Sequence, residues 1–396
     1  MNVYFVSIKK YFLGLVARVI NIFVCVKTKH WVFASDFGNQ YRESPKYLFE
    51  YMIKEHPDFC CTYIVANKDT YKEIAEKGYP VVMNFSLKGI LTIAKAEKIF
   101  TSQTPHDMFY AYKKKGRKFY YLNHGQSLKK QMNALSSDYK KLVGQSGIIP
   151  YLKGVFHKLI CNNFSVADSE FVSANSVFFI PFLKASYGES MKIKILGMPR
   201  NDALFNDEEM RKERWIEGLN GKFIITYMPT HRKYGKGALA PVPFANRQDI
   251  QDWLRQNNCV LLMKQHPNMI PKNKETHDTD VIKDITKLAL DPQVIIYHSD
   301  VLVSDYSSVW LDYLLLRRPL ITYLYDDFEK NDAGLNIDIK KDSPGHLCFD
   351  EDNLFVTLKK IKSNYDEMRP SEEIIEKFYL DADGNSSKRY FHELVQ

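Results

Sequence analysis

Histidine and serine residues suited to phosphate chemistry recur in this chain directly after short apolar runs. His124, His266 and the pair Ser307 and Ser308 each occupy such a position. An imidazole can remove a proton from a hydroxyl near neutral pH. Serine hydroxyls and the free backbone N–H groups at the start of a helix can bind phosphate oxygens. These residue types therefore indicate a site for a ligand that contains phosphate, with His124 as the candidate general base.

The same positions also have structural interpretations, which the sequence leaves open. A histidine at the end of a strand is often a hydrogen-bonding structural residue, and Ser307 can serve only to cap a helix. Gly125 either marks a tight turn or lets a ligand approach the backbone closely. Arg232 is either a salt-bridge residue or a donor to phosphate. Lys129 is either a solvated charge or a residue that steers an anionic acceptor.

The serine pair lies in a segment, 299–327, that reads as strand, turn, helix and second strand. Its parts are a strand at 301–303, a turn at 304–308, a helix at 310–316 and a strand at 320–325. Ser304, Ser307 and Ser308 supply the turn with hydroxyl groups for a phosphate. Asp305 is negatively charged, so we expect it to brace the turn or to contact a ligand hydroxyl.

Strand and helix patterns alternate along the chain, which predicts an α/β protein with parallel sheets and helices on their faces. The other expected strands are 31–35, 60–66, 81–82, 98–101, 119–122, 159–165, 192–196, 223–227, 259–264 and 294–297. The other expected helices are 44–56, 69–77, 86–96 and a helical segment towards the C-terminus. Because the carboxyl ends of parallel strands converge on one crevice, the motifs that follow several of these strands can share a site.

Length and charge indicate two domains and an anionic partner. A chain of 396 residues exceeds one typical core, and the polar stretch 206–222 is the best candidate for a linker. The expected organisation is a membrane-associating segment at 1–29, two α/β domains at 30–210 and 211–370, and a helical segment at 371–396 that can cross back to the first domain. The net charge of +8 favours a nucleotide, a phosphopolymer or an acidic bilayer. No nucleic-acid motif is recognisable, so no nucleic-acid partner is expected.

The first 29 residues have the composition of an amphipathic helix that lies in the plane of an anionic membrane. One helical face would carry Phe12, Leu15, Val16, Val19, Ile20 and Phe23, and positive charge comes from Lys9, Lys10, Arg18, Lys27 and Lys29. Arg18 interrupts the apolar run, so a membrane-spanning helix is not expected. The alternative is an ordinary first helix that packs in the core. The six scattered cysteines are typical of reduced thiols in a cytosolic protein. The predicted location is therefore peripheral, on the cytoplasmic face of the cell membrane.

Five short motifs occur in a defined order along the chain. They are His124-Gly125 followed by Leu128-Lys129, Gly197-Met198-Pro199-Arg200-Asn201-Asp202, Pro229-Thr230-His231-Arg232, Lys264-Gln265-His266-Pro267 and Ser304-Asp305-Tyr306-Ser307-Ser308. A final segment is Asp383-Gly384-Asn385-Ser386-Ser387-Lys388-Arg389. This ordered set resembles the CDP-glycerol glycerophosphotransferase family, which makes teichoic acids and related phosphopolyol capsules.

The resemblance implies a GT-B fold, in which two Rossmann-like domains face each other across a cleft and the second domain holds the nucleotide. It implies that His124 is the base and that His266 binds and neutralises the donor phosphates. The remaining phosphate contacts would come from the turn with Ser307 and Ser308. The implied substrates are CDP-glycerol or a related CDP-polyol and a lipid-linked acceptor at the membrane surface. A divalent cation such as Mg²⁺ is compatible with this reaction but is not predicted from the sequence.

Two motifs depart from the family pattern, in which Trp-His-Gly-Thr-Pro and Thr-Trp-Arg are common. Here the corresponding residues are Asn123-His124-Gly125-Gln126-Ser127 and Thr230-His231-Arg232. These departures leave the transferred polyol and the acceptor open. Two other functions also remain. One is a GT-B glycosyltransferase that uses a CMP- or UDP-sugar for a surface polysaccharide, and the other is a non-catalytic protein that binds a nucleotide or a membrane.

Overall fold

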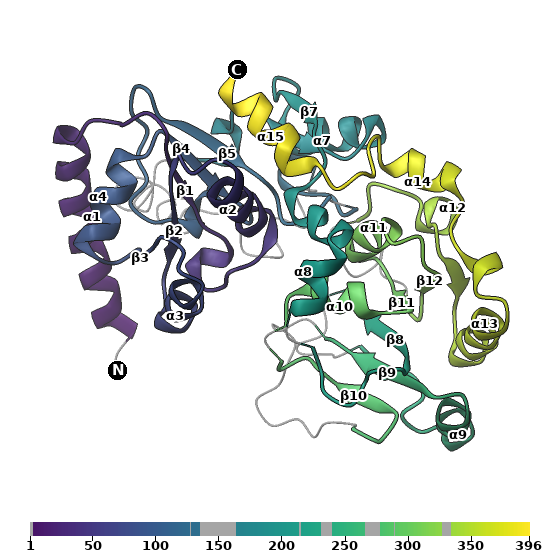
Figure 1. The fold of residues 1–396 in the computed structure, drawn as a ribbon. Coiled ribbons are helices and arrows are strands. Elements are labelled where there is room, and N and C mark those ends of the chain that lie inside the picture. The colour runs from purple at the N-terminus through teal and green to yellow at the C-terminus, as the bar shows by residue number, and fades with distance from the viewer. Residues whose placement is uncertain are drawn as a thin grey trace. The chain divides into compact units, whose positions relative to one another are not determined.

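The protein divides into two compact units, seen in a computed structural model (Figure 1). The residues described are 3–126, 128–134, 164–213, 215–230, 240–265, 278–288, 290–326 and 334–396, without the side chains of 3–10. Unit 1 comprises Met1–His124, Ser136–Asp202 and Asp383–Gln396. Unit 2 comprises Gly125–Leu135 and Ala203–Ala382. Each unit is therefore assembled from segments that lie far apart in the sequence.

Unit 1 is built on a five-stranded parallel sheet with the order β3-β2-β1-β4-β5. The strands are β1 (His30–Phe33), β2 (Cys60–Val65), β3 (Val81–Met83), β4 (Lys98–Thr101) and β5 (Lys118–Tyr121). A small parallel pair, β6 (Val172–Ala174) and β7 (Ile193–Ile195), completes the unit's strands among the described residues. The side chains of the central strands are buried on both faces, as in parallel sheets covered by helices.

Helices cover both faces of this sheet, with α1 and α4 on one side and α2 on the other (Figure 1). Among the described residues, the helices of unit 1 are α1 (Val3–Phe23), α2 (Glu43–Glu55), α3 (Lys68–Glu76), α4 (Leu87–Lys95), α7 (Ile180–Tyr187) and α15 (Ser386–Val395). Phe49 of α2 and Leu394 of α15 belong to the same buried cluster as Trp31 of β1. The last segment of the chain therefore supplies part of the core of the first sheet.

Unit 2 contains a six-stranded parallel sheet with the order β10-β9-β8-β11-β12-β13. The strands are β8 (Phe223–Met228), β9 (Cys259–Met263), β10 (Ile282–Asp284), β11 (Val301–Ser304), β12 (Leu320–Tyr323) and β13 (His346–Cys348). Numbered within the unit, this order is 3-2-1-4-5-6, the arrangement of Rossmann folds that bind dinucleotides. Ligands of such sheets bind at the carboxyl ends of the strands.

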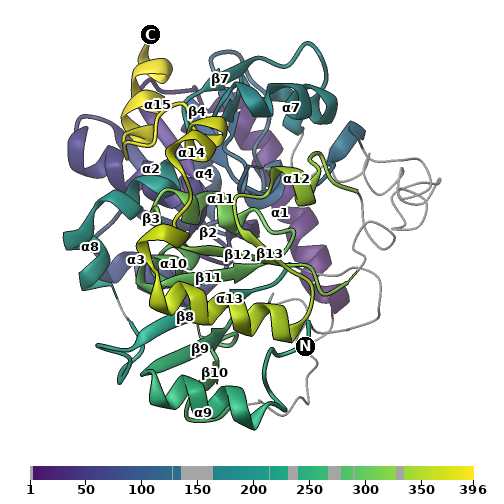
Figure 2. The same ribbon diagram turned by 90° about the vertical axis from the view of Figure 1, so that its right-hand side faces the viewer.

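Alternate residues of the unit 2 strands face two different helical layers. Ile225 and Tyr227 of β8 share a buried cluster with Leu254 and Leu358, whereas Ile224 shares another with Ile295. Figure 2 shows α13 lying across one face of the sheet. In the described part of unit 2 the helices are α8 (Asp207–Lys212), α9 (Gln248–Gln256), α10 (Pro292–His298), α11 (Val309–Leu314), α12 (Ile339–Asp342), α13 (Glu351–Ser363) and α14 (Glu372–Phe378).

The expected strand at 294–297 was wrong, because this run forms α10. Its β-branched and aromatic residues suggested a strand, but Asp291 caps the helix by accepting the N–H of Gln293, and Pro292 occupies the first turn. A buried apolar run of this length does not distinguish a strand from a helix. The stretch 206–222, expected to be a linker, contains α8 and contributes the buried Leu219 to unit 2. The expected strand at 159–165 lies mostly outside the described residues.

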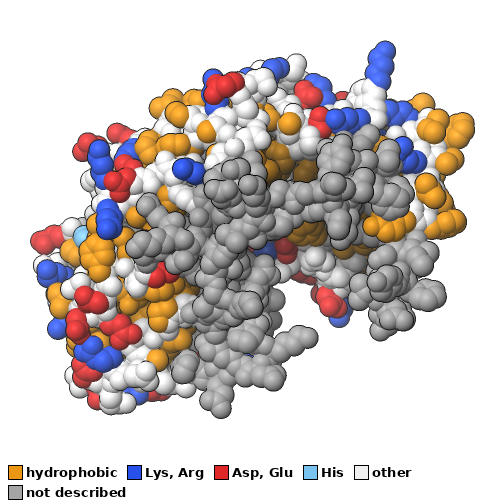
Figure 3. All heavy atoms as spheres, turned by 180° about the vertical axis from the view of Figure 1, so that it is seen from behind, with side chains coloured by type: hydrophobic (Ala, Val, Ile, Leu, Met, Phe, Trp, Pro, Cys, Tyr) orange, Lys and Arg blue, Asp and Glu red, His pale blue; other side chains and the backbone are white. Residues whose placement is uncertain are grey.

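Helix α1 presents apolar residues on two sides. Ala17 is buried with Ile90 of α4 and with Tyr112, and Arg18 lies over the Tyr112 ring at 5.2 Å. The opposite side is exposed and carries Phe12, Leu15, Val19, Ile22 and Phe23, with Phe12 65% and Phe23 79% exposed. Apolar side chains are visible at the edge of the molecule where α1 lies (Figure 3). None of the helices in the described ranges combines the length and the apolar character needed to cross a bilayer.

Helix α4 packs closely against the end of β3 at Gly89. A Cβ atom at Gly89 would lie 2.1 Å from the carbonyl oxygen of Met83, the last residue of β3. Alanine normally stabilises a helix by about 1 kcal/mol relative to glycine. Here we expect Gly89→Ala to destabilise the protein by about 1–3 kcal/mol, because the new methyl group forces the helix away from the strand.

The measurement is the midpoint of urea unfolding. Thr92→Ala in the same helix is the matched control, since its hydroxyl bonds only to the backbone one turn earlier, and it should change stability little. A Gly89→Ala protein that is more stable than the parent would contradict this account of the packing.

Candidate functional site

His124 follows β5 closely and belongs to unit 1. The preceding residue, Asn123, has a φ of 59°, a left-handed conformation that asparagine tolerates better than most residues. The side-chain oxygen of Asn123 accepts the backbone N–H of His124 at 2.8 Å. The His124 side chain itself is exposed. The backbone is thus fixed locally while the ring can reach a ligand.

Arg200 connects the backbone of His124 to the start of α2. Its Nη1 donates to the carbonyl oxygen of His124 at 2.6 Å and to Oε2 of Glu43 at 2.7 Å. The side chains of Arg200 and Glu43 are only 9% and 13% exposed. Arg200 lies in the 3-10 segment η6 (Pro199–Phe205), which continues the Gly-Met-Pro-Arg-Asn-Asp motif.

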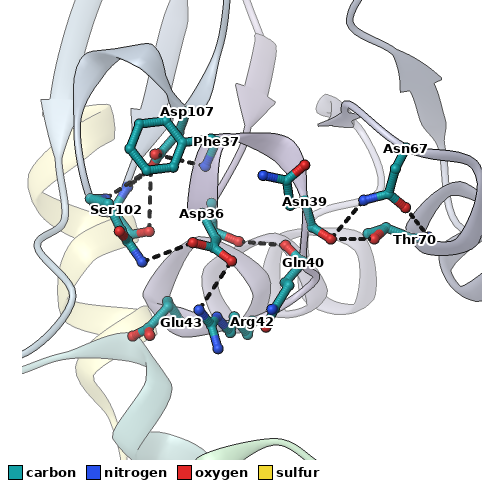
Figure 4. Close-up of polar contacts among 12 residues, drawn as sticks. Asp36, Phe37, Asn39, Gln40, Arg42, Glu43, Asn67, Thr70, Ser102 and Asp107 are labelled. Atoms are coloured by element: carbon teal, nitrogen blue, oxygen red, sulfur yellow. Dashed lines mark hydrogen bonds and ion pairs between the residues drawn. The ribbon is translucent and has the colours of Figure 1, made fainter. Parts of the chain in front are cut away.

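The loop between β1 and α2 carries further charged groups at the same edge of the sheet (Figure 4). Arg42 forms an ion pair of 3.0 Å with Asp36, which also accepts a hydrogen bond from Gln103 at 3.1 Å. Asp107 accepts the backbone N–H groups of Ser102 and Gln103 after β4 and of Phe37 after β1. Side chains therefore tie together the loops that follow two neighbouring strands.

Two non-glycine residues of this loop and the first residue of α2 have positive φ angles. The values are 47° for Asp36, 56° for Phe37 and 65° for Glu43. Such conformations cost free energy and persist only where the surroundings enforce them, often at functional sites. The sequence motifs did not identify Asp36, Arg42 or Glu43 as site residues. For Asp36 the available signal was its position shortly after β1, whereas Arg42 and Glu43 lie at the start of α2 and carried no such signal.

The surroundings of His124 favour the neutral form of its imidazole. Although the ring has exposed surface, the protein crowded around it reduces hydration of the charged form and lowers its pKa below the usual 6.5. The carboxylate of Glu43 raises this pKa, and Arg200 and Arg42 lower it. A neutral imidazole near pH 7 is the protonation state that a general base requires.

In unit 2, the turn after β11 is bonded to the end of the neighbouring strand β8. Ser304 donates its hydroxyl to the carbonyl oxygen of Met228 at 2.7 Å, and Asp305 accepts the backbone N–H of Thr230 at 2.8 Å. Both Ser304 and Asp305 are buried. The expectation that Asp305 braces the turn agrees with this contact. Ser304 likewise holds the turn in place through its hydroxyl.

Ser307 and Ser308 lie where the turn meets α11 and are partly buried. The side-chain oxygen of Ser307 accepts the N–H of Val309 at the long distance of 3.4 Å, and Ser308 forms no side-chain cap. α11 has only six residues, so its dipole is small. What the turn offers a phosphate is therefore its hydroxyl and N–H groups rather than a long helix.

Of the other predicted residues, Gly125 and Lys129 lie within the described ranges, and Arg232 and His266 do not. Gly125 has a φ of 144° and begins a segment of unit 2. Lys129 pairs with Leu335 in an antiparallel bridge, and its carbonyl oxygen accepts the side-chain N–H of Asn336 at 3.0 Å. Arg232 and His266 lie outside the described residues. In the chain they follow β8 and β9, which are neighbours of each other in the sheet.

The predicted residues are thus divided between the units. The carboxyl ends of β9, β8 and β11 are adjacent in unit 2, as the motif positions required, whereas His124 belongs to unit 1. The closeness of His124 to Ser307 stays a prediction. Across the described ranges, no three histidine, cysteine or acidic side chains gather in a way that could hold a metal ion. A role for Mg²⁺ likewise remains untested.

The sequence matches the family described as CDP-Glycerol:Poly(glycerophosphate) glycerophosphotransferase over residues 16–396. A teichoic acid glycerol-phosphate transferase of Staphylococcus aureus is 30% identical over 372 residues, which cover 90% of this chain and 90% of that protein. A teichoic acid poly(glycerol phosphate) polymerase of Bacillus subtilis is 28% identical over 85% of this chain, but over only 44% of its own length.

The fold of a wall teichoic acid polymerase TagF is also similar. Its solved structure aligns with 100% of this chain and 98% of that chain, with a TM-score of 0.73 and 22% sequence identity. At this identity the likeness concerns the fold alone. It supports the assignment of both halves as α/β units with parallel sheets.

Asn123 can be tested by two substitutions that separate its conformation from its hydrogen bond. Asn123→Gly keeps the left-handed backbone accessible but removes the bond to the N–H of His124. Asn123→Ala removes the bond and also forces a Cβ atom into the unfavourable conformation. We expect the alanine protein to be less stable than the glycine protein by about 1–2 kcal/mol in chemical unfolding. Equal stability of the two, or the reverse order, would show that this conformation carries no cost.

Proposed function

This chain belongs to the CDP-glycerol:poly(glycerophosphate) glycerophosphotransferase family, and we propose that it transfers glycerol phosphate from CDP-glycerol to a hydroxyl of a lipid-linked acceptor in teichoic acid or capsule synthesis. The observation that carries the proposal is the family match over residues 16–396. The similarity to a Staphylococcus aureus transferase over nine-tenths of both chains supports it. The sugar-transfer and non-catalytic alternatives have no observation in their favour.

In the proposed reaction, His124 takes the proton of the acceptor hydroxyl. The hydroxyl oxygen attacks the β-phosphorus of CDP-glycerol and forms a new P–O bond. The bond between that phosphorus and the bridging oxygen breaks, and CMP leaves with the electron pair. The exposed ring of His124 and its lowered pKa support the role of base, because the ring can accept a proton near neutral pH.

The donor would bind at the carboxyl edge of the unit 2 sheet. The 3-2-1-4-5-6 strand order supports this, as do the partly buried hydroxyls of Ser307 and Ser308. Arg232 and His266, which follow two neighbouring strands of that sheet, would neutralise the phosphates of the donor. A GT-B arrangement, in which the two units face each other, would then bring His124 to the β-phosphorus.

We expect His124→Ala to reduce turnover by about 10²–10⁴-fold, because general-base catalysis is lost. Binding of CDP-glycerol, measured by calorimetry, should change little, since the donor is proposed to bind unit 2. Turnover is followed by mass spectrometry of the product, using a panel of CDP-alcohols and a lipid-linked acceptor. The same panel identifies the polyol, and transfer of a sugar instead would favour the glycosyltransferase alternative.

His392→Ala is the matched control, because this histidine lies on α15 of unit 1 and interacts with His56, a residue that precedes β2. It should retain the turnover of the parent protein. Normal turnover in the His124→Ala protein would exclude His124 as the base.

The exposed side of α1 would attach the enzyme to an anionic membrane. Its five large apolar residues lie on one side of a helix that is otherwise packed on unit 1. Exposed apolar side chains on a helix gain free energy by entering the boundary between headgroups and acyl chains. The positive net charge of the chain adds attraction to anionic lipid.

Vesicles that contain phosphatidylglycerol test this attachment by co-sedimentation. Replacing Phe12, Val19 and Phe23 together by serine should weaken vesicle binding at least about 10-fold, because three apolar side chains no longer enter the lipid. The matched control replaces Val177, Val356 and Leu380, which are exposed elsewhere, and should bind like the parent. Unchanged binding of the α1 variant would contradict the proposed attachment.

A further inference from the structure

We propose that Arg200 is a positioning residue for the base, holding the backbone of His124 in place while Glu43 holds Arg200. The inference rests on the proposed function, in which His124 accepts the proton of the acceptor hydroxyl. All three residues belong to unit 1, so the arrangement is internal to that unit.

The backbone of His124 is held from both sides by side chains. Arg200 donates to its carbonyl oxygen at 2.6 Å, and Asn123 accepts its N–H at 2.8 Å. Neither bond belongs to the β-sheet, since β5 ends at Tyr121. Within the part of the chain that the structure describes, no hydrogen bond to either ring nitrogen of His124 is found. The main chain is therefore fixed while the ring stays available, as catalysis requires.

Arg200 is held by Glu43, and the segment that carries Arg200 is held by Asp202. Glu43 accepts from the same Nη1 at 2.7 Å, and both side chains are nearly buried, so water screens this charged bond poorly. Two residues further along, Asp202 accepts the backbone N–H groups of Ser386 and Ser387 at the start of α15. The backbone of the segment that carries Arg200 is thereby attached to α15, while the guanidinium itself is held by Glu43 and by the carbonyl oxygen of His124.

The strained conformation of Glu43 agrees with this role. Glu43 is the first residue of α2 and has a φ of 65°. A non-glycine residue is held in this conformation only when other contacts offset its cost. The ion pair with Arg200 is such a contact, and it directs the carboxylate towards the guanidinium rather than into solvent.

Charge gives Arg200 and Glu43 opposite effects on the imidazole of His124. Desolvation of the imidazole by the surrounding protein is the largest cause of its lowered pKa. Among the charged neighbours, Glu43 raises the pKa of His124, whereas Arg200 and Arg42 lower it. Arg42 is paired with Asp36 and stays in place when Arg200 is changed. Removing the charge of Arg200 should therefore raise the pKa of His124, and removing that of Glu43 should lower it. Opposite shifts in the two variants would show that both charges act on the His124 ring in the folded protein, and loss of folded protein alone would not produce them.

The test combines turnover with a titration of His124 by NMR of protein labelled at histidine Cε1. The His124 signal is assigned by its absence from the spectrum of His124→Ala. Arg200→Gln should lower kcat about 10- to 100-fold through misplacement of the base, with little change in KM for CDP-glycerol. Its His124 titration midpoint should move to higher pH. Glu43→Gln should move this midpoint to lower pH.

Arg200→Lys separates charge from geometry. Lysine keeps the positive charge but is shorter and lacks the planar guanidinium, so the midpoint should stay near that of the parent while kcat still falls. This conservative variant also keeps the proposal testable if Arg200→Gln does not fold. Arg255→Gln is the matched control, because this arginine pairs with Asp252 and Asp280 on the surface of unit 2, and it should change neither quantity.

A parent value of kcat in both Arg200 variants would overturn the proposal, and so would a parent His124 midpoint in the Arg200→Gln protein. So would a loss of kcat that only follows the loss of folded protein, with an unchanged midpoint in the folded fraction. Absence of transfer by the parent protein would overturn the proposed function instead. The titration does not depend on turnover, so it would still decide whether Arg200 acts on His124.

Discussion

Backbone groups at the carboxyl edge of a parallel sheet have no further strand to pair with, and the candidate site depends on how this chain satisfies them. In unit 1 a buried carboxylate does so: Asp107 accepts N–H groups from the loops after β1 and β4. An unpaired buried N–H would cost about 1–3 kcal/mol, so these bonds decide where the loops lie. The loops in turn set the positions of Asp36 and Glu43.

Unit 2 meets the same constraint in the same way. Asp305 is buried and accepts the N–H of Thr230, which joins the turn after β11 to the end of β8. Ser304 adds a second bond between the same two strand ends. In both units, then, an acidic side chain at the carboxyl edge of the sheet accepts backbone N–H groups of the loops that follow the strands. This explains how a carboxylate can stand in a turn that is expected to receive phosphate.

Much of the fold is readable from the sequence, because the central strands are continuous apolar runs such as Phe223–Met228, bounded by polar turns. The run at 294–297 was wrongly predicted as a strand, because all of its side chains are buried and the helical period of apolar residues is therefore not visible. Only Asp291-Pro292 indicates the start of a helix. His124 was identifiable from its position after a strand. The role of Arg200 was not, because its partners Glu43 and the carbonyl of His124 are distant in sequence and are brought together only by the fold.

The attachment of α15 to unit 1 bears on how the protein is made. Tyr390 and Leu394 of α15 pack in the same buried cluster as Trp31 and Phe49. The backbone N–H groups at the start of α15 donate to Asp202. These residues follow the whole of unit 2 in the sequence, so a ribosome makes them after that unit. The apolar core of the first sheet therefore lacks the side chains of α15 while the whole of unit 2 is translated. Its apolar surface is exposed to chaperones or to aggregation during that interval, and the segment that carries Arg200 gains its contact with α15 only after unit 2 has been made.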